Sequence, residues 1–268
     1  MLPTIIVGHL APDLDCLVAI WILMRRAHPA AEVRFVPAGT TLGGHPVDRD
    51  PAVIHVDTGG GRYDHHHTAA TDVCAAELVR RHVAPGDLAL RRLVAHVCAV
   101  DHARARDDAS GFGVVALIAG LHLCHPDDPG AVYAAMAPNL DAWLAAEEQQ
   151  VQARIAYARR VAFATPWGPG VALEGMGSAG AGRMAFAAGA VLYIYRDQRG
   201  GMGVVAQARA AVDLAPLSRA LALRDATADW YLHPGGRMVL CGSATAPPRR
   251  PSRLTLAELI EMVRQAPR

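Results

Sequence analysis

The stretch that decides the fold is Pro3–Pro29, PTIIVGHLAPDLDCLVAIWILMRRAHP. Its first part is a β-branched run that ends at Gly8 and His9, which predicts a short buried strand followed by a loop. From Leu14 onward, apolar residues occupy most faces of a helical pattern that stops at Pro29. A strand followed by a helix packed on a sheet is typical of an α/β domain.

Two further strands are predicted at 32–39 (EVRFVPAG) and 52–57 (AVIHVD). The order strand, helix, strand, with short turns between them, indicates a doubly wound N-terminal domain with a mostly parallel sheet. Ligands of such sheets gather at the carboxyl ends of the strands. We therefore expect His9 and Asp57, which each end a strand, to lie on the same rim.

The rest of the chain predicts a helical middle and a smaller C-terminal α/β or α+β domain. A long helix should begin near Asp127, break near Pro138 and continue to about Ala164, before the TPWGPG break. We accordingly place one domain at 1–125, a helical linker at 126–165 and a second domain at 166–268. Helices are also expected at 71–83, 88–105, 113–124, 214–223 and 254–266, and strands at 170–176, 188–197, 202–209 and 237–243.

Composition excludes several classes of protein. Of 268 residues, 52% are hydrophobic and 19% charged, which fits a globular rather than a disordered chain. A net charge of +1 and 5% aromatic residues provide neither the electrostatic field nor the stacking platforms of a general nucleic-acid binder. No leader peptide or membrane-spanning run is visible, so we expect a cytoplasmic protein.

The five cysteines form no CxxC pair. Their odd number and mostly apolar neighbours predict reduced, buried side chains of a cytosolic protein, and neither a disulfide framework nor a zinc ribbon. They are Cys16, Cys74, Cys98, Cys124 and Cys241.

Acids and histidines follow several of the apolar runs. Each has a structural explanation by itself, since Asp13 could cap a helix, the histidines after Asp64 could be a solvated loop, and Asp101 could simply end a helix. Together they form a set of carboxylates and imidazoles on one rim, which suits divalent ions of the Mn, Fe, Co or Zn type. A pair of such ions is what phosphoryl hydrolysis requires. The full set is His9, Asp13, Asp15, Asp57, Asp64, His65, His66, His67 and Asp101.

In this order, GHLAPDLD, an apolar run ending in Asp57, DHH at 64–66 and the downstream Asp101 resemble the DHH phosphoesterase superfamily. Its members include family II inorganic pyrophosphatases, RecJ-type exonucleases, and nanoRNA and cyclic-dinucleotide phosphodiesterases. The resemblance covers residues 1 to about 105 and implies that the first domain is a metal-binding catalytic domain.

The resemblance also implies individual roles. Two divalent ions, commonly Mn²⁺ with Mg²⁺ or Co²⁺ as alternatives, would share six ligands. Asp57 would bridge the ions, and Asp101 is a second candidate for a bridging ligand. Asp64 would orient a histidine ring, and His66 would face the substrate phosphate or the attacking water, whereas His67 has no counterpart. The implied metal ligands are His9, Asp13, Asp15, Asp57, His65 and Asp101.

The stretch WYLHPGGRMVLCGS in the second domain is the nearest match to a glycine-rich substrate loop of relatives. His233, Gly235, Gly236 and Arg237 would suit capture of a phosphate, with Arg237 as a bidentate donor. A β-hairpin whose HPGG turn is only a turn is the alternative.

These observations predict a divalent-metal-dependent phosphohydrolase, preferably a phosphodiesterase acting on short oligonucleotides or small nucleotides. An inorganic pyrophosphatase-like hydrolase and a non-catalytic metal-binding module that retains the fold are the alternatives. The expected partner is a small phosphate ester, nucleotide or short oligonucleotide. Stable binding of duplex nucleic acid or of a membrane is not expected, and a homodimer is an open possibility.

Overall fold

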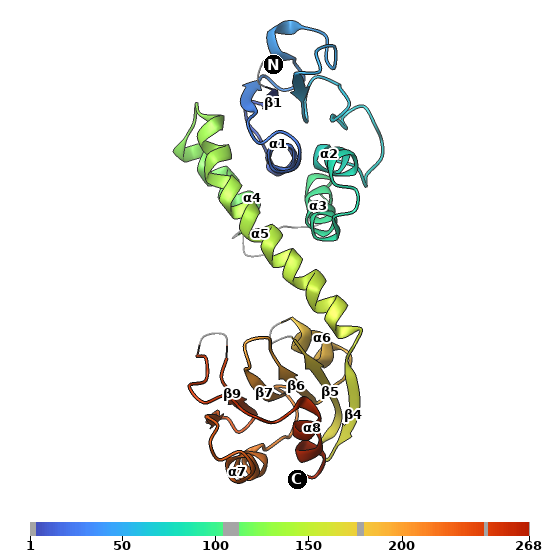
Figure 1. The fold of residues 1–268 in the computed structure, drawn as a ribbon. Coiled ribbons are helices and arrows are strands. Elements are labelled where there is room, and N and C mark those ends of the chain that lie inside the picture. The colour runs from blue at the N-terminus through green and yellow to red at the C-terminus, as the bar shows by residue number, and fades with distance from the viewer. Residues whose placement is uncertain (1–3, 104–112, 176–179, 244–245, 268) are drawn as a thin grey trace. The chain divides into compact units, whose positions relative to one another are not determined.

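The computed structural model describes residues 4–103, 113–175, 180–243 and 246–267. The chain divides into two compact units, Met1–Glu148 and Gln149–Arg268 (Figure 1). The predicted α/β class is confirmed, because the first unit holds a parallel sheet with helices and the second a mixed sheet. In the part of the chain that is described, no helix is both long and apolar enough to span a bilayer.

The sheet of the first unit has three parallel strands, β1 (Ile5–His9), β2 (Glu32–Val36) and β3 (Val53–His55), in the order β2-β1-β3. The β-branched run of β1 fills the middle of this sheet, where Ile6 and Val7 are fully buried. Parallel pairing of β1 with β3 puts the carboxyl ends of both strands at one edge.

Three helices pack together beside this sheet. Helix α1 (Leu14–Arg26) contacts β1, α2 (Ala75–Val83) and α3 (Leu88–Asp101) (Figure 1). Residues Leu14–Leu23 of α1 are all buried, which explains why its apolar residues are not confined to one face. A short 3₁₀ helix, Leu42–Gly44, lies between β2 and β3, and α4 (Val114–Cys124) follows α3.

Helix α5 differs from the sequence prediction at two points. It runs without interruption over Pro129–Tyr157 with Pro138 inside it, so the expected break is wrong. A proline removes one helical hydrogen bond, and here the buried side chains of Met136 and Leu140 keep the helix packed on either side of it. The prediction of helix up to Ala164 is also wrong, because Val161–Thr165 forms strand β4, paired antiparallel with the next strand.

The second unit is a six-stranded mixed sheet with helices on both faces. Along β6, Leu192 and Ile194 join the core formed with α7 and α8, whereas Tyr193 and Tyr195 join the core formed with α6. This alternation is the period of two expected for a strand buried on both faces. The strand order is β4-β5-β6-β7-β9-β8, and the elements are β5 (Gly168–Glu174), α6 (Ala181–Ala187), β6 (Leu192–Arg196), β7 (Met202–Ala206), α7 (Ala215–Arg224), β8 (Trp230–Leu232), β9 (Met238–Cys241) and α8 (Leu256–Arg264).

The prediction that all cysteines are reduced and buried is wrong. Cys74 and Cys98 form a disulfide, and Cys124 is exposed, while Cys16 and Cys241 are buried free thiols as expected. The two bonded cysteines are 24 residues apart, and it is the packing of α2 on α3 that brings them together. Sequence spacing alone carries no sign of this pairing.

Candidate metal centre

The rim predicted at the ends of β1 and β3 exists. His9 is the last residue of β1 and Asp57 lies just beyond β3, and His9 Nε2 is 3.3 Å from Asp57 Oδ2. The backbone of Asp57 has a φ of 56°, a left-handed conformation that is uncommon for a residue with a side chain. Its N–H donates to the carbonyl oxygen of Tyr63, so the loop that follows holds this conformation in place.

The two aspartates at the start of α1 have different local roles. Asp13 caps the helix, because its carboxylate accepts a hydrogen bond from the N–H of Cys16. Asp15 is almost fully buried, and its carboxylate accepts hydrogen bonds from the N–H groups of Ala75, at 2.7 Å, and Ala76, at 2.8 Å. These are the first two residues of α2, so the amino end of one helix holds a carboxylate of another.

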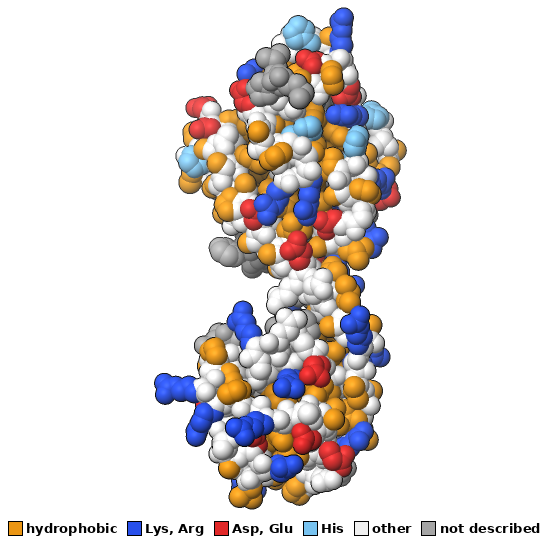
Figure 2. All heavy atoms as spheres, in the orientation of Figure 1, with side chains coloured by type: hydrophobic (Ala, Val, Ile, Leu, Met, Phe, Trp, Pro, Cys, Tyr) orange, Lys and Arg blue, Asp and Glu red, His pale blue; other side chains and the backbone are white. Residues whose placement is uncertain are grey.

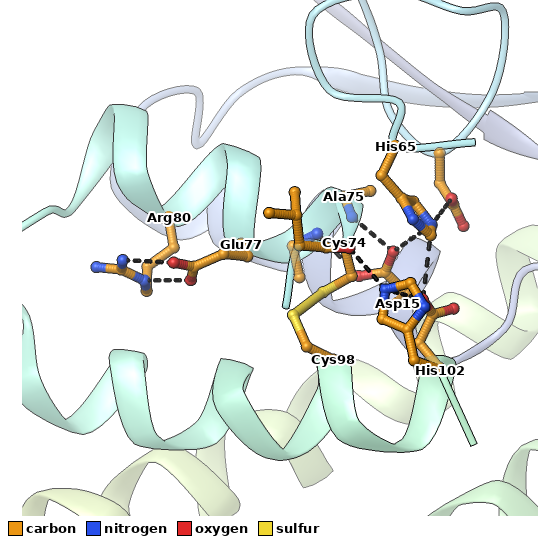
Figure 3. The surroundings of a disulfide bond; sticks show 12 residues. Asp15, His65, Cys74, Ala75, Glu77, Arg80, Cys98 and His102 are labelled. Carbon is orange, nitrogen blue, oxygen red and sulfur yellow. Dashed lines mark hydrogen bonds and ion pairs between the residues drawn. A yellow bond between two sulfur atoms is a disulfide. The ribbon is translucent and has the colours of Figure 1, made fainter. Parts of the chain in front are cut away.

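The ring of His65 lies among three carboxylates (Figure 3). Its Nε2 atom is 3.5 Å from Asp57 Oδ1, 3.6 Å from Asp15 Oδ2 and 3.6 Å from Asp101 Oδ2. Asp101 is the last residue of α3. Tertiary packing therefore brings together a carboxylate–histidine cluster, which consists of His9, Asp15, Asp57, His65 and Asp101.

The loop between Asp57 and His66 turns through glycines. Gly59 and Gly60 have φ values of 79° and 72°, which residues other than glycine rarely adopt. The turn allows the carboxylate of Asp64 to accept hydrogen bonds from the N–H of Gly60 and of His66. The carboxylate also accepts from Nδ1 of His66, at 2.8 Å, so Asp64 orients His66 rather than His65. His67 is exposed on the same loop. Figure 2 shows several histidine and acidic side chains on the visible face of the first unit.

Burial and charge pull the ionisation of the cluster in opposite directions. Burial, together with repulsion from Asp57, raises the pKa of Asp15 well above its ordinary value. Burial also acts to raise the pKa of Asp57, but polar contacts with His65 and His9 outweigh it and lower that pKa to about 2. The contact with Asp57 raises the pKa of His65 to about 9. Acids crowded together in a buried site, with only imidazole side chains as cationic partners, favour the addition of positive charge.

Unpaired ligand atoms give a direct test of whether these residues fit a metal ion. Among the described residues, five buried side-chain nitrogen or oxygen atoms have no hydrogen-bond partner. Three of the five are Asp57 Oδ1, His65 Nε2 and Asp101 Oδ2, which belong to the cluster and lie around one another. Buried polar atoms without partners are costly and rare, and a bound cation would satisfy all three at once. The residues present therefore fit a metal ion.

Two candidate ligands were not assigned from the sequence. Cys16 Sγ groups with His9 and Asp57, and His102 groups with His65 and Asp101. Burial raises the pKa of the Cys16 thiol well above its usual value, which disfavours the thiolate. His102 Nε2 donates to the carbonyl of Val73. Each residue directly follows a predicted ligand, and that adjacency was the only signal in the sequence.

A cavity of about 220 Å³ opens beside the cluster, lined by Asp13, Asp15 and Asp101 with apolar side chains around them. Asp13 thus faces the same cavity as two members of the cluster. The cavity is smaller than the roughly 300–1,000 Å³ of a pocket that encloses a whole drug-sized ligand. It has room for a small polar group, such as one phosphoryl group of a larger molecule.

The residues of the predicted substrate loop lie in the second unit, in the turn between β8 and β9. His233 Nδ1 accepts from the N–H of Gly235, Gly236 has a φ of 68°, and a guanidinium nitrogen of Arg237 donates to the carbonyl of Ala208. The His233–Gly235 contact and the conformation of Gly236 are those of a hairpin turn, and Arg237 joins the turn to the segment after β7. Arg237 also lines a cavity of about 570 Å³ with Trp167 and Asp213, so a place for a ligand exists beside the turn.

Neither the family models nor the curated proteins compared with this chain contain a match. Among solved structures, one described as the DHH domain of a member of a family of ribosomal proteins is 14% identical, with a TM-score of 0.36, over 97% of this chain and 85% of its own. A second, described as an uncharacterized protein from Helicobacter pylori G27, is 12% identical, with a TM-score of 0.28, over 98% of both chains. Likenesses this weak do not bear on the function of this chain.

Proposed function

We propose that this chain is a DHH-type, divalent-metal-dependent phosphohydrolase, and that its reaction is hydrolysis of a phosphodiester. The observation that carries the proposal is the set of three unpaired buried ligand atoms, Asp57 Oδ1, His65 Nε2 and Asp101 Oδ2. They come from three separate parts of the chain and meet at the carboxyl edge of a parallel sheet, where α/β folds place their ligands.

The donor set favours manganese. Carboxylate oxygens suit hard cations such as Mg²⁺ and Mn²⁺, and imidazole nitrogens beside them shift the preference toward Mn²⁺. We infer that His9, Asp13, Asp15, Asp57, His65 and Asp101 would hold two such ions. When bound, such ions supply a hydroxide at neutral pH and neutralise the charge on phosphoryl oxygens.

The chain's own contribution to the chemistry is the pair of Asp64 and His66. Two backbone N–H groups fix the Asp64 carboxylate, and that carboxylate fixes Nδ1 of His66. The imidazole is otherwise exposed, with 66% of its side chain accessible, so its Nε2 atom is open to a substrate. We infer that His66 holds a phosphate oxygen or passes a proton at this atom.

The proposed substrate is a short oligonucleotide or a small nucleotide. The cavity beside the carboxylates fits a phosphoryl group better than a whole nucleotide, so the remainder of the substrate would have to bind outside it. The second unit is proposed to bind substrate phosphate through Arg237 and the turn at His233, beside the cavity that Arg237 lines. Pyrophosphate is the alternative substrate.

The test begins with metal analysis of the purified chain, followed by assays with Mn²⁺. Substrates are a short RNA, linear and cyclic dinucleotides, a bis-aryl phosphodiester and pyrophosphate. Asp57→Ala and His65→Ala are expected to lose bound metal and activity. His67→Ala, a histidine exchanged on the same loop, should keep both.

Each alternative outcome has a clear meaning. Metal binding without hydrolysis of any substrate would contradict the enzyme proposal and favour a non-catalytic metal-binding module. Hydrolysis of pyrophosphate alone would favour the pyrophosphatase alternative. Activity that survives both alanine exchanges would place the chemistry elsewhere in the chain.

A further inference from the structure

A disulfide lies directly beside the proposed metal centre (Figure 3). Cys74 is the residue that precedes α2, and Cys98 belongs to the last turn of α3. The bond fixes the Cα atoms of the two residues 5.4 Å apart. Both cysteines are almost fully buried.

The first end of the bond controls the support of Asp15. Cys74 is followed immediately by Ala75 and Ala76, whose N–H groups hold the two oxygens of the Asp15 carboxylate. Any displacement of the start of α2 moves these donors. Asp15 has no freedom to follow, because it sits in the buried first turn of helix α1.

The second end of the bond controls the position of Asp101. Cys98 lies one helical turn before Asp101 in α3. His102, which follows Asp101, donates from Nε2 to the carbonyl of Val73, at 2.8 Å, so the same two segments are joined a second time. The end of α3 and the segment that leads into α2 are thus joined on both sides of Asp101.

His65 shows why this spacing matters to a metal ion. Its Nε2 atom lies 3.6 Å from Asp15 Oδ2 and 3.6 Å from Asp101 Oδ2, one carboxylate supported by α2 and the other carried by α3. The distance between α2 and α3 therefore sets the width of the ligand set. The covalent link between Cys74 and Cys98 holds that separation, whereas two free thiols would leave the helices without a bond between them.

We propose that Cys74 and Cys98 are positioning residues of the metal centre, whose disulfide sets the separation of the Asp15 and Asp101 carboxylates and so sets the affinity for the ions. This inference rests on the proposed function, since it concerns the same site. Groups that orient metal ligands without touching the ion typically change metal affinity by about 10–100-fold when removed.

The test measures Mn²⁺ affinity by calorimetry and by the electron paramagnetic resonance signal of free Mn²⁺. The protein with the bond intact is compared with the double variant Cys74→Ala/Cys98→Ala. The matched control is Cys124→Ala/Cys241→Ala, which removes two cysteines and leaves the bond. We expect Mn²⁺ affinity to fall at least about 10-fold in the first variant and to be unchanged in the control.

Reduced wild-type protein is a second form without the Cys74–Cys98 bond, and it is measured in case the double variant misfolds. A small dithiol reduces the disulfide of the wild-type protein to two thiols and is itself oxidised to a cyclic disulfide. The reagent is then removed under anaerobic conditions. Thiol titration in denaturant should then count all five cysteines, against the three free ones of the oxidised chain. Reoxidation should restore the Mn²⁺ affinity. Circular dichroism should show that the double variant and the reduced wild-type protein keep their fold.

The outcomes separate the two proposals. If folded protein without the disulfide binds Mn²⁺ as tightly as protein with it, the positioning role is wrong and the proposed function is unaffected. If the double variant and the reduced wild-type protein both unfold, the positioning role is also wrong, because the disulfide then stabilises the whole fold. If the protein with the disulfide intact binds no Mn²⁺, both the proposed function and this inference are wrong.

Discussion

Nε2 of His65 lies 3.5 Å from Oδ1 of Asp57, and neither atom has a hydrogen-bond partner within the described residues. Both atoms are buried, so the contact forms in a medium where unpaired polar groups are costly. A site of this kind is strained without a cation and relieved by one.

The first prediction concerns stability. Mn²⁺ at 100 times its dissociation constant should raise the free energy of unfolding of the first unit by about 2.7 kcal/mol for each ion bound, because the ions bind only the folded chain. Thermal melts with and without a chelator measure this. Asp101→Asn, which removes one carboxylate of the cluster, should lose most of the gain, and a gain of the same size in that variant would contradict the ligand assignment.

The second prediction concerns the orientation of His66. Asp64→Ala removes the acceptor of the Gly60 and His66 N–H groups and of His66 Nδ1. We expect kcat to fall about 10–100-fold with a smaller change in Mn²⁺ affinity. Asp64→Asn keeps an oxygen acceptor and should fall less. Equal kcat in all three proteins would show that the pair has no part in the reaction.

The third prediction uses neighbouring glycines of the same loop. Gly60→Ala places a side chain at a φ of 72° in open space, and should cost about 1 kcal/mol of unfolding free energy. Gly59→Ala has a similar φ of 79°, but its Cβ would lie 2.9 Å from Thr41 Cγ2 and 3.2 Å from the Thr40 carbonyl oxygen. Overpacking should add about 1–3 kcal/mol there. Denaturant titration compares the two, and equal losses would contradict the close approach of Thr40 and Thr41 to the loop.

The fourth prediction is a pH dependence near the disulfide. Glu77 and Arg80 form a largely buried bidentate pair. Burial raises the pKa of Glu77, but the hydrogen bonds from Arg80 and Arg81 outweigh it and lower that pKa below its ordinary value. A lowered pKa in the folded state means that the stabilisation is complete above the unfolded pKa, about 4.3, and is lost as pH falls through the folded pKa.

Glu77→Gln tests this dependence. It should cost about 2 kcal/mol of unfolding free energy at pH 7, from lost charge-assisted hydrogen bonds, and the difference from wild type should vanish in acid. The control Glu174→Gln removes an exposed partner of Arg196 and should change little at either pH. A difference that persists unchanged in acid would rule out the ion pair as its source.

The fifth prediction concerns the second unit. Arg237→Ala should raise KM for a nucleotide substrate about 10-fold, the value of one charge-assisted hydrogen bond, and leave kcat unchanged. Arg219→Ala, an exposed arginine of α7 in the same unit, is the control. If KM is the same in both variants, the turn at His233 is a hairpin turn and nothing more.

Much of the first unit was predictable because its signals are local. The β-branched run before His9, the buried pattern of α1 and the capping position of Asp13 follow from neighbouring residues. The second unit was less predictable. Strand β4 was assigned to a helix, because its pairing with β5 rather than its own sequence decides its conformation.

The sequence by itself determined which carboxylates and histidines are present and that parallel strands would bring His9 and Asp57 to one rim, because strand order and strand ends can be read along the chain. Only the tertiary structure decided what surrounds them. The packing of α2 on α3 places the first N–H groups of α2 on Asp15 and bonds Cys74 to Cys98, and the loop after Asp57 carries His65 between carboxylates from two helices. Such contacts depend on helix spacing and side-chain burial, which long-range packing sets and local sequence does not.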